Sequence, residues 1–330
     1  MCGVPGVRRL TEPLVTVYMP SYNHARFLPA ALESVSRQTF GDFEFIVVDD
    51  CSSDESVAII ERWLTEQPFP CTFVKHAENR GVCRTLNEIL SKARGKYWAG
   101  VASDDSWSPE FLERFVCRVE QLPEDVAVLY GDVEVIDDQG RVSPELYIGR
   151  FLQSGAPPEG KVFDDLWKLN FVPAAATMCR TDCLRDVGGY DEGLWYEDWD
   201  LWLRLADRYS FAFQPGVHAQ RRIAGTSMTR TPIWSRRMAE SRRRIRLGWF
   251  AKLAGSHEAP EDTLYWPDGA EDLYSIGDPR AVRFASRKWH FERSLRSLLL
   301  LSCIRTGLPY SGYERLLKWT RTLRGITEGR

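Results

Sequence analysis

Two adjacent acids, Asp104 and Asp105, follow the apolar segment 97–101 and precede a predicted helix with Ser108 as its cap and Pro109 at its first position. Neighbouring carboxylates repel each other, so we expect a cation to compensate them. Mg²⁺ and Mn²⁺ bind through one or two carboxylates plus the phosphates of a substrate, and they neutralise a leaving diphosphate. Alternatively, both acids only precede a helix and interact favourably with its dipole.

A second acidic pair, Asp49 and Asp50, ends the apolar segment 43–48. A carboxylate at the end of a strand can accept a hydrogen bond from a nucleobase N–H or a ribose hydroxyl, although such acids also occur in solvated loops. The segment 20–27 (PSYNHARF), after the first predicted strand, contains none of the glycines of a dinucleotide or P-loop site. The ring of Tyr22 could stack on a nucleobase there, and an ordinary turn is the alternative.

A third pair, Glu197 and Asp198, opens a predicted helix over 198–208, after the turn residues 188–189. An acid at this position is either a helix cap or, on the rim of a site, a general base. Three tryptophans lie between Trp195 and Trp202. Aromatic side chains line many sugar sites, and they also pack in protein cores.

The elements that position these acids alternate along the chain. Strands are predicted at 14–19, 43–48, 71–75, 97–101 and 126–136, with helices at 26–37, from Ser53 or Asp54 to about 64, at 82–93 and at 111–122. A further strand is predicted at 210–222. This order indicates an α/β fold with a mainly parallel central sheet. The carboxyl ends of its strands would bring residues 20–23, 49–50 and 104–105 to one rim.

Composition limits the function classes. The 330 residues are 44% hydrophobic, which is enough for a core, and the net charge of −3 argues against a nucleic-acid partner. Residues 280–330 carry twelve Lys and Arg against three acids, so a basic C-terminal region is expected to meet an anionic surface. The eight cysteines form no CxxC pair, and residues 1–10 lack the apolar stretch of a signal peptide. We therefore expect a cytoplasmic protein with free thiols.

Four stretches occur in an order and at a spacing that resemble a known family. They are VTVYMPSYNHARFLPAALESVSRQTF, FEFIVVDDCSSDES, NRGVCRTLNEILSKARGKYWAGVASDDSW and GGYDEGLWYEDWDLWLRL. Over about 13–230 the chain resembles the inverting GT-A glycosyltransferases of family two, which use nucleotide-diphospho-sugars. The resemblance implies a Rossmann-like GT-A catalytic domain over 13–230. Residues 1–12 would then be an N-terminal extension, and 231–330 a mainly helical, basic region.

The resemblance also implies roles for the matched residues. Asp198 matches the catalytic base, Asp105 the ligand of Mn²⁺ or Mg²⁺, and Asp50 the acid that contacts uracil. UDP is therefore the expected nucleotide, although a thymidine nucleotide fits the same contact. The expected donor-binding residues are Pro20, Tyr22, Asn23, Asp49, Asp50, Arg80, Arg84 and Asp104. The expected acceptor or supporting residues are Trp195, Glu197, Arg221 and Arg222.

The chain departs from the family pattern at two places. Ile223 falls where the family often has His, so phosphate contact there would pass to Arg221 or Arg222, and the metal motif has adjacent acids rather than acid-x-acid. The expected acceptor is a glycan or lipid-linked hydroxyl, in surface polysaccharide or lipopolysaccharide biosynthesis. A sugar nucleotidyltransferase and a non-catalytic nucleotide-sugar-binding module are the alternatives.

The basic C-terminal region leaves several possibilities open. It mixes Arg with Trp, Phe and Leu, which is typical of helices that lie on an anionic membrane surface. Peripheral contact with the cytoplasmic face of the inner membrane is one hypothesis. Binding of acceptor phosphates, a helical subdomain packed on the core, and a helix that forms a homo-oligomer are the others.

Overall fold

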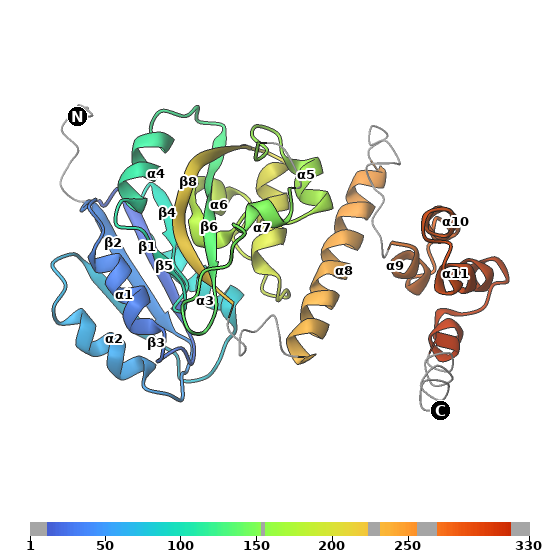
Figure 1. Ribbon diagram of the computed structural model, residues 1–330, viewed down its shortest axis with the longest axis horizontal. Helices are drawn as coiled ribbons and strands as arrows, with labels where there is room; N and C mark the ends of the chain where they lie inside the picture. Colours follow the sequence, from blue (N-terminus) through green and yellow to red (C-terminus); the bar gives the residue numbers. More distant parts are fainter. Residues whose placement is uncertain (1–11, 153–155, 224–231, 256–268, 318–330) are drawn as a thin grey trace. The chain divides into compact units, whose positions relative to one another are not determined.

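The computed structural model describes residues 12–152, 156–223, 232–255 and 269–317 (Figure 1). Contacts divide the chain into two units, Met1–Met238 and Ala239–Arg330. The domain boundaries predicted at residues 12/13 and 230/231 lie at or beyond the limits of the described ranges. The division into a catalytic and a C-terminal region stays a prediction.

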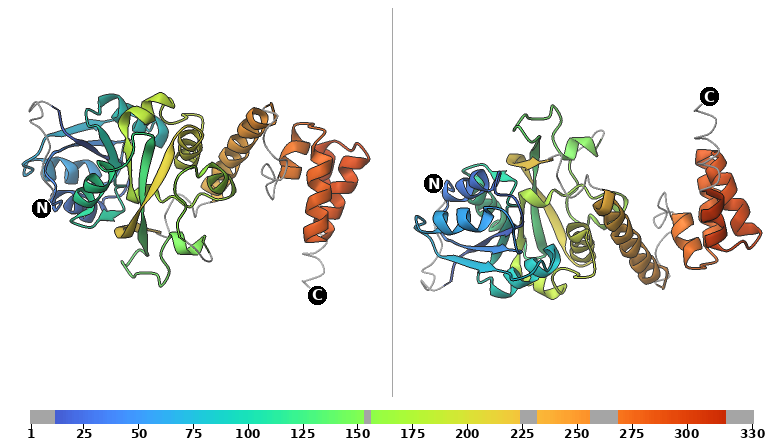
Figure 2. Two further views of the ribbon diagram at one scale, coloured as in Figure 1. Left: turned by 90° about the horizontal axis from the view of Figure 1, so that it is seen from above. Right: turned by 90° about the horizontal axis from the view of Figure 1, so that it is seen from below.

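The first unit is built on one eight-stranded sheet in the order β3-β2-β1-β4-β7-β6-β8-β5. The pairs β1–β2, β1–β4, β2–β3 and β6–β8 are parallel, and the pairs β4–β7, β6–β7 and β5–β8 are antiparallel. Figure 2 shows the long strands β6 and β8 side by side. The mainly parallel α/β sheet expected from the sequence is confirmed. The strands are β1 (Val15–Ser21), β2 (Phe43–Asp49), β3 (Cys71–Lys75), β4 (Tyr97–Gly100), β5 (Ser106–Trp107), β6 (Val126–Ile136), β7 (Thr177–Arg180) and β8 (Ser210–Arg222).

The helices follow the strands as the alternating pattern predicts. Because β1, β2 and β3 succeed one another toward one edge, right-handed crossovers place α1 and α2 on one face, where Figure 1 shows them side by side. The connection from β3 to β4 runs in the opposite direction and carries α3 to the other face. The helices are α1 (Leu28–Ser36), α2 (Ser56–Leu64), α3 (Val82–Lys92), α4 (Phe111–Val119), α5 (Phe163–Lys168), α6 (Thr181–Asp186) and α7 (Glu197–Ala206), with the 3₁₀ turns η1 (Ile148–Arg150) and η2 (Ala174–Ala176).

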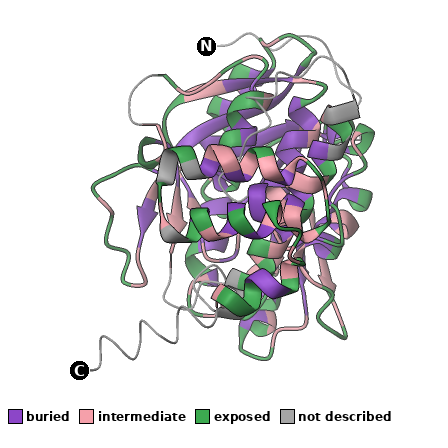
Figure 3. Cartoon of the chain, turned by 90° about the vertical axis from the view of Figure 1, so that its right-hand side faces the viewer, coloured by how far each residue is buried: buried purple, intermediate pink, exposed green. Residues whose placement is uncertain are grey.

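Burial explains the composition of these elements. All seven residues of β2 are buried, as expected for a central strand covered on both faces, so residues 45–48 are a continuous apolar run and the buried Glu44 is paired with Arg94 at 2.7 Å. Helices instead carry buried and exposed residues on one element, as Figure 3 shows. In α4 the buried side chains are Phe111, Leu112, Phe115, Val116 and Val119, at helical spacing.

The helix start expected from Ser108 and Pro109 is wrong, whereas the start at residue 111 expected from apolar periodicity is confirmed. Residues 106–107 form β5, and α4 begins at Phe111 rather than at Pro109. The Ser108 N–H donates to the carbonyl of His218, at 2.9 Å, and the Trp107 indole donates to the carbonyl of Ala175, at 2.8 Å. These contacts with segments far along the chain hold residues 106–108 extended and override the local capping signal.

The second unit is helical in its described part. It contains the C-terminal part of α8 (Pro232–Gly255), with α9 (Gly269–Ser275), α10 (Ala281–Glu292) and α11 (Leu295–Arg305). Its core includes Ala285, Leu300 and Tyr313, and Lys288 forms a buried ion pair with Glu271 at 3.1 Å. No helix in the described ranges has the length and apolarity needed to cross a bilayer. The predicted membrane, acceptor or oligomer contacts of this region stay predictions.

Gly100 gives a test of the packing that supports the site. A Cβ at this position would lie 2.0 Å from the Tyr18 ring, which is buried and stacks on Trp98 with the ring centroids 4.0 Å apart. Gly100→Ala should therefore lower the free energy of unfolding by about 1–3 kcal/mol, measured by urea denaturation. A Cβ on Gly41 would meet nothing within 4 Å, so Gly41→Ala is the matched control. Equal stability of the two variants would contradict this account.

Candidate functional site

Three neighbouring strands bring the predicted polar clusters together. β1 lies between β2 and β4, and the register pairs Ser21 with Asp49 and Tyr18 with Gly100. The segments that follow these parallel strands therefore meet at one edge of the sheet, as the sequence predicts. The position of each side chain at this edge distinguishes residues that hold the site together from residues that remain open to a ligand.

Asp49 and Asn23 connect the loops after β1 and β2. Buried Asp49 accepts hydrogen bonds from the Ser21 hydroxyl and from both the N–H and the hydroxyl of Ser52. Asn23 adopts a left-handed backbone with φ of +53°, and its Oδ1 accepts a 2.8 Å hydrogen bond from the Ser53 N–H. Both residues were predicted to bind the donor, and here their polar atoms fix the loops.

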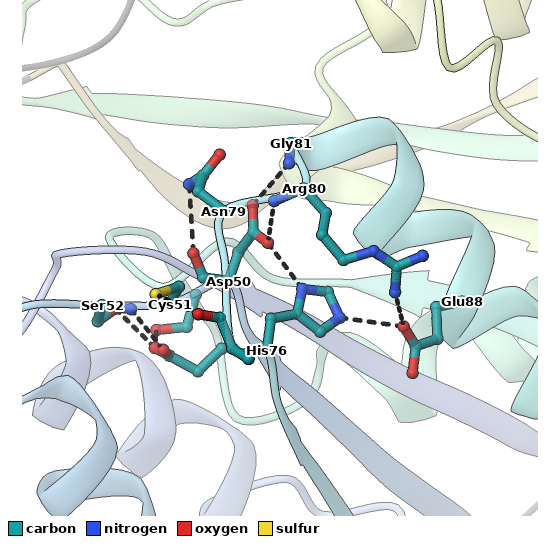
Figure 4. A network of polar contacts seen from close by, with 11 residues as sticks. Asp50, Cys51, Ser52, His76, Asn79, Arg80, Gly81 and Glu88 are labelled. Atoms are coloured by element: carbon teal, nitrogen blue, oxygen red, sulfur yellow. Dashed lines mark hydrogen bonds and ion pairs between the residues drawn. The ribbon is translucent and has the colours of Figure 1, made fainter.

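Asp50 occupies the centre of a polar network (Figure 4). Its Oδ1 accepts the Arg80 N–H and contacts His76 Nδ1, at 2.8 and 2.7 Å, and its Oδ2 accepts the Gly81 N–H at 2.8 Å. His76 Nε2 in turn contacts Glu88 at 3.0 Å. Asp50 thus anchors the loop before α3, where its negative charge also suits the helix N-terminus. These contacts use three of the roughly four lone-pair positions of the carboxylate. One position is left for the predicted contact with a nucleobase.

The other predicted donor-binding residues differ in how they are engaged. The Arg80 guanidinium pairs with Glu88 at 2.9 Å, and Arg84 pairs with Glu192 at 3.3 Å. Both arginines are substantially exposed, so a ligand phosphate could compete for them. Tyr22 is 44% exposed and Pro20 is half-buried beside it. The exposed ring is consistent with the predicted stacking on a base.

Asp104 and Asp105 lie in the turn after β4, and Arg222 holds that turn. The Arg222 N–H donates to Asp105 Oδ1 at 2.8 Å, and its guanidinium donates to the carbonyls of Asp104 and Asp137. His24 Nδ1 lies 2.8 Å from the Ser103 hydroxyl and 3.9 Å from Asp104 Oδ1. Arg222 therefore supports the turn that carries the predicted metal ligand, beside its predicted role in phosphate contact.

The donor set of this turn fits a divalent cation bound partly by a substrate. No cluster of three or more His, Cys, Asp or Glu side chains suited to a metal occurs in the described ranges. Mg²⁺ and Mn²⁺, however, need only one or two carboxylates when phosphates complete the shell. Burial and the neighbouring Asp104 raise the pKa of Asp105 to about 8. A cation bound at this carboxyl group would favour its ionised form and so offset both the burial and the repulsion from Asp104.

Glu197 and Asp198 lie in the first turn of α7. Asp198 Oδ1 accepts the Trp199 N–H at 2.6 Å and the Asn170 side-chain amide at 3.3 Å. Burial raises the pKa of Asp198, opposed by Arg221 and by these hydrogen bonds. Burial and the Asp198 charge raise the pKa of Glu197 to about 8. An acid of raised pKa in a partly buried position is suited to accept a proton near neutral pH.

Arg221 is the cation that these acids share. Burial lowers its pKa, but Tyr147, Asp105 and Asp198 raise it and the net change is upward. Its guanidinium lies 4.9 Å from the centre of the Tyr147 ring. Trp195, predicted as an acceptor contact, has the Arg237 guanidinium 4.2 Å from its ring centre. The structure thus brings Asp105, Asp198 and Arg221 into one electrostatic site.

Sequence reasoning missed three residues of this site. His24 lies inside the stretch PSYNHARF but was not singled out, because its partners Ser103 and Asp104 are distant in sequence. His76 and Asn170 belong to no recognisable motif. A signal for His76 was its place directly after a predicted strand, where site residues gather.

Asp50 gives a test of the network in Figure 4. Asp50→Ala removes a charged acceptor from the Arg80 and Gly81 amides, and each such bond contributes about 1.5–3 kcal/mol. Hydrogen exchange at these two amides should accelerate by roughly 10- to 100-fold. Asp182→Ala, at a side chain that is 96% exposed, is the control. Unchanged protection at both amides would show that Asp50 does not hold the loop.

Glu197 predicts a specific dependence of stability on pH. Its pKa in the folded protein lies near 8, above the ordinary value of 4.5, so the folded state binds this proton more tightly than the unfolded state. The resulting stabilisation is fully present below pH 4.5 and is lost as the pH rises through 8. The Tm advantage of Glu197→Gln over wild type should therefore grow from pH 4.5 to 8. Exposed Glu192→Gln is the control, and parallel Tm curves for wild type and Glu197→Gln would refute the shift.

The chain can now be compared with known proteins. It is 28% identical to an uncharacterized glycosyltransferase of Rickettsia prowazekii, over 68% of this chain and 69% of that protein. It is 34% identical to a protein of Escherichia coli named as a colanic acid biosynthesis glycosyl transferase, WcaA. That match spans 34% of this chain and 39% of the relative.

Solved structures share the fold. Staphylococcus aureus TarS 1–349, in complex with UDP-GlcNAc, superposes with a TM-score of 0.57 at 18% identity, covering 88% of this chain and 79% of that one. The mannosyltransferase PcManGT from Pyrobaculum calidifontis, in complex with GDP-Man and Mn²⁺, gives 0.56 at 21% identity, covering 93% and 84%. The family model for glycosyl transferase family 2 matches residues 16–188, more than half of the chain. On this match, and with the GT-A architecture of its sheet, the chain belongs to glycosyl transferase family 2.

Proposed function

We propose that this glycosyltransferase moves a sugar from a UDP-sugar to a hydroxyl of a glycan or lipid-linked acceptor, with inversion at the anomeric carbon. The observation that carries the proposal is the shared position of Arg221. One guanidinium interacts with Asp105, on the predicted diphosphate side, and with Asp198, the predicted base. This shared influence, with the 2.8 Å hydrogen bond from the neighbouring Arg222 N–H to Asp105 Oδ1, supports the assignment of both acids to one site.

The proposed reaction needs one base. Asp198 takes the proton of the acceptor hydroxyl, the acceptor oxygen bonds to the anomeric carbon, and the bond from that carbon to the diphosphate oxygen breaks. The electron pair of that bond leaves with the nucleoside diphosphate. Because attack comes from the face opposite the leaving group, the configuration inverts. Arg221 balances the acids on both sides, and Asp105 would hold a divalent cation, which neutralises diphosphate charge when bound, with Asp104 on the ribose side of the donor.

Two relatives support the choice of substrates. The TarS structure contains UDP-GlcNAc and the PcManGT structure contains GDP-Man and Mn²⁺, so a nucleotide-sugar with a divalent cation suits this fold. The remaining lone pair of Asp50 and the exposed ring of Tyr22 support a uracil base. The relative named for colanic acid biosynthesis supports surface polysaccharide as the product class.

Nucleotide binding tests the proposal first. UDP, GDP, CDP and dTDP, each with and without Mn²⁺, are compared by thermal shift on wild type, Asp105→Ala and Asp198→Asn. At about 100 times its Kd, UDP with Mn²⁺ should add about 2.7 kcal/mol and raise the Tm by about 5 °C. Asp105→Ala should lose the Mn²⁺-dependent part of that rise.

Asp198→Asn separates binding from chemistry in the same experiment. It should keep the rise in Tm with UDP but release UDP from UDP-GlcNAc or another UDP-sugar at least about 100-fold more slowly than wild type. Asp182→Asn, at a side chain that is 96% exposed, is the control acid outside the proposed site. Stabilisation of wild type by none of the four nucleotides, or full turnover in Asp198→Asn, would reject the proposal.

A further inference from the structure

We propose that Asn170 is a positioning residue for the base: it holds Oδ1 of Asp198, so that Oδ2 is the atom that accepts the acceptor's proton. This inference rests on the proposed function of Asp198. It adds a residue that lies in no recognised motif, in the short segment between α5 and η2.

The position of Asn170 is well defined by its contacts. The residue is 92% buried, and its Nδ2 donates to Asp198 Oδ1 at 3.3 Å and to the Tyr196 hydroxyl at 3.2 Å. An ionised carboxylate only accepts hydrogen bonds, so the nitrogen end of the amide must face Asp198. The orientation of the amide is therefore fixed by chemistry.

The two oxygens of Asp198 are in different situations. Oδ1 accepts two hydrogen bonds, from Asn170 Nδ2 and from the Trp199 N–H, which occupy both of its lone pairs. Neither Asn170 nor Trp199 donates to Oδ2, although the N–H of Asp198 itself also interacts with the carboxylate. An incoming hydroxyl would therefore find its acceptor at Oδ2, and Asn170 and the first turn of α7 together fix the direction in which this atom points.

A comparison with Asn87 distinguishes this role from ordinary scaffolding. Asn87 ties α3 to the segment at Tyr190 with both ends of its amide, accepting the Tyr190 N–H at 2.8 Å and donating to the Tyr190 carbonyl at 2.9 Å. Asn170 uses only its nitrogen, and its buried Oδ1 has no partner among the described residues. Buried amide oxygens normally have a partner, so this oxygen is available to a water molecule or to a bound ligand.

Titratable groups from three elements face Asp198. Glu197 lies beside it on α7, Arg221 reaches it from β8, and Tyr147 comes from the turn before η1. A hydrogen bond donated to the carboxylate favours its charged form and lowers its pKa, as the bond from Asn170 does. Loss of that donor, with the other groups unchanged, must therefore raise the pKa of the base.

The pH dependence of turnover tests the proposal. Release of nucleoside diphosphate from UDP-GlcNAc and GDP-Man is measured across pH 5–9 for wild type, Asn170→Ala, Asn170→Asp and Asn87→Ala. Asn170→Ala should lower kcat by about 10- to 100-fold and leave KM for the donor within about twofold. The acidic limb of its pH–rate profile, where activity falls as the base becomes protonated, should move to higher pH. Asn170→Asp, equal in shape but without the donor, should move that limb further. Asn87→Ala should leave the acidic limb at the same pH as in wild type.

A second measurement requires no turnover. In a double-mutant cycle of Asn170→Ala and Asp198→Ala, followed by Tm at pH 7, the loss caused by Asn170→Ala should shrink by at least half once Asp198 is absent. The positioning role would be overturned if the Tm losses of the two single variants simply added in the double variant. It would also be overturned if the acidic limb of the pH–rate profile stayed at the wild-type pH in the Asn170 variants. Absence of turnover in wild type, or full turnover in Asp198→Asn, would instead reject the proposed function, while the cycle still tests the contact.

Discussion

The site depends on one cation surrounded by acids. Asp105, Glu197 and Asp198 come from two segments far apart in the chain, and each is influenced by the Arg221 guanidinium. Burial alone would favour the protonated form of all three, because a carboxylate removed from water is costly without a partner. Arg221 opposes this, and it can do so because β8, which carries it, is paired with β6 along most of its length. The electrostatics of the site therefore rest on the pairing of two strands.

The adjacent acids of the sequence perform two different tasks. Asp49 and Asp50 use most of their hydrogen-bonding capacity on the protein itself, and they fix the loop of residues 51–53 and the loop before α3. Asp105 accepts the Arg222 N–H at Oδ1, and Asp198 accepts the Asn170 amide and the Trp199 N–H at Oδ1, so that these donors leave the second oxygen of each acid available. Acids that the sequence presents alike therefore differ in the structure: Asp49 and Asp50 hold loops, and Asp105 and Asp198 keep capacity for the proposed ligands. Hydrogen bonds to both carboxylate oxygens set Asp49 and Asp50 apart from Asp105, which accepts at Oδ1.

These differences also show what the sequence could predict. The alternation of strands and helices was predictable, because it follows from local apolar periodicity, and the meeting of three strand ends followed from the parallel order. The extended residues 106–108 were not predictable, because the partner of Ser108 is the carbonyl of His218. The role of Asp50 depended in the same way on amides thirty residues further along the chain. His24 and Asn170 gave no local signal, because each becomes meaningful only beside its partner acid.

The predicted donor-binding residues and the residues around Asp198 come from different parts of the sheet. The predicted donor residues, apart from the basic residues of β8, follow the parallel strands β1, β2, β3 and β4. The predicted base, the amide that contacts it and the shared cation come from residues 170–221, around the antiparallel strand β7 and the strand β8. The family match ends at residue 188, before Glu197. The assignment of Asp198 therefore draws its support from geometry: it is an acid of raised pKa, held at one oxygen, that shares a cation with the donor side of the site.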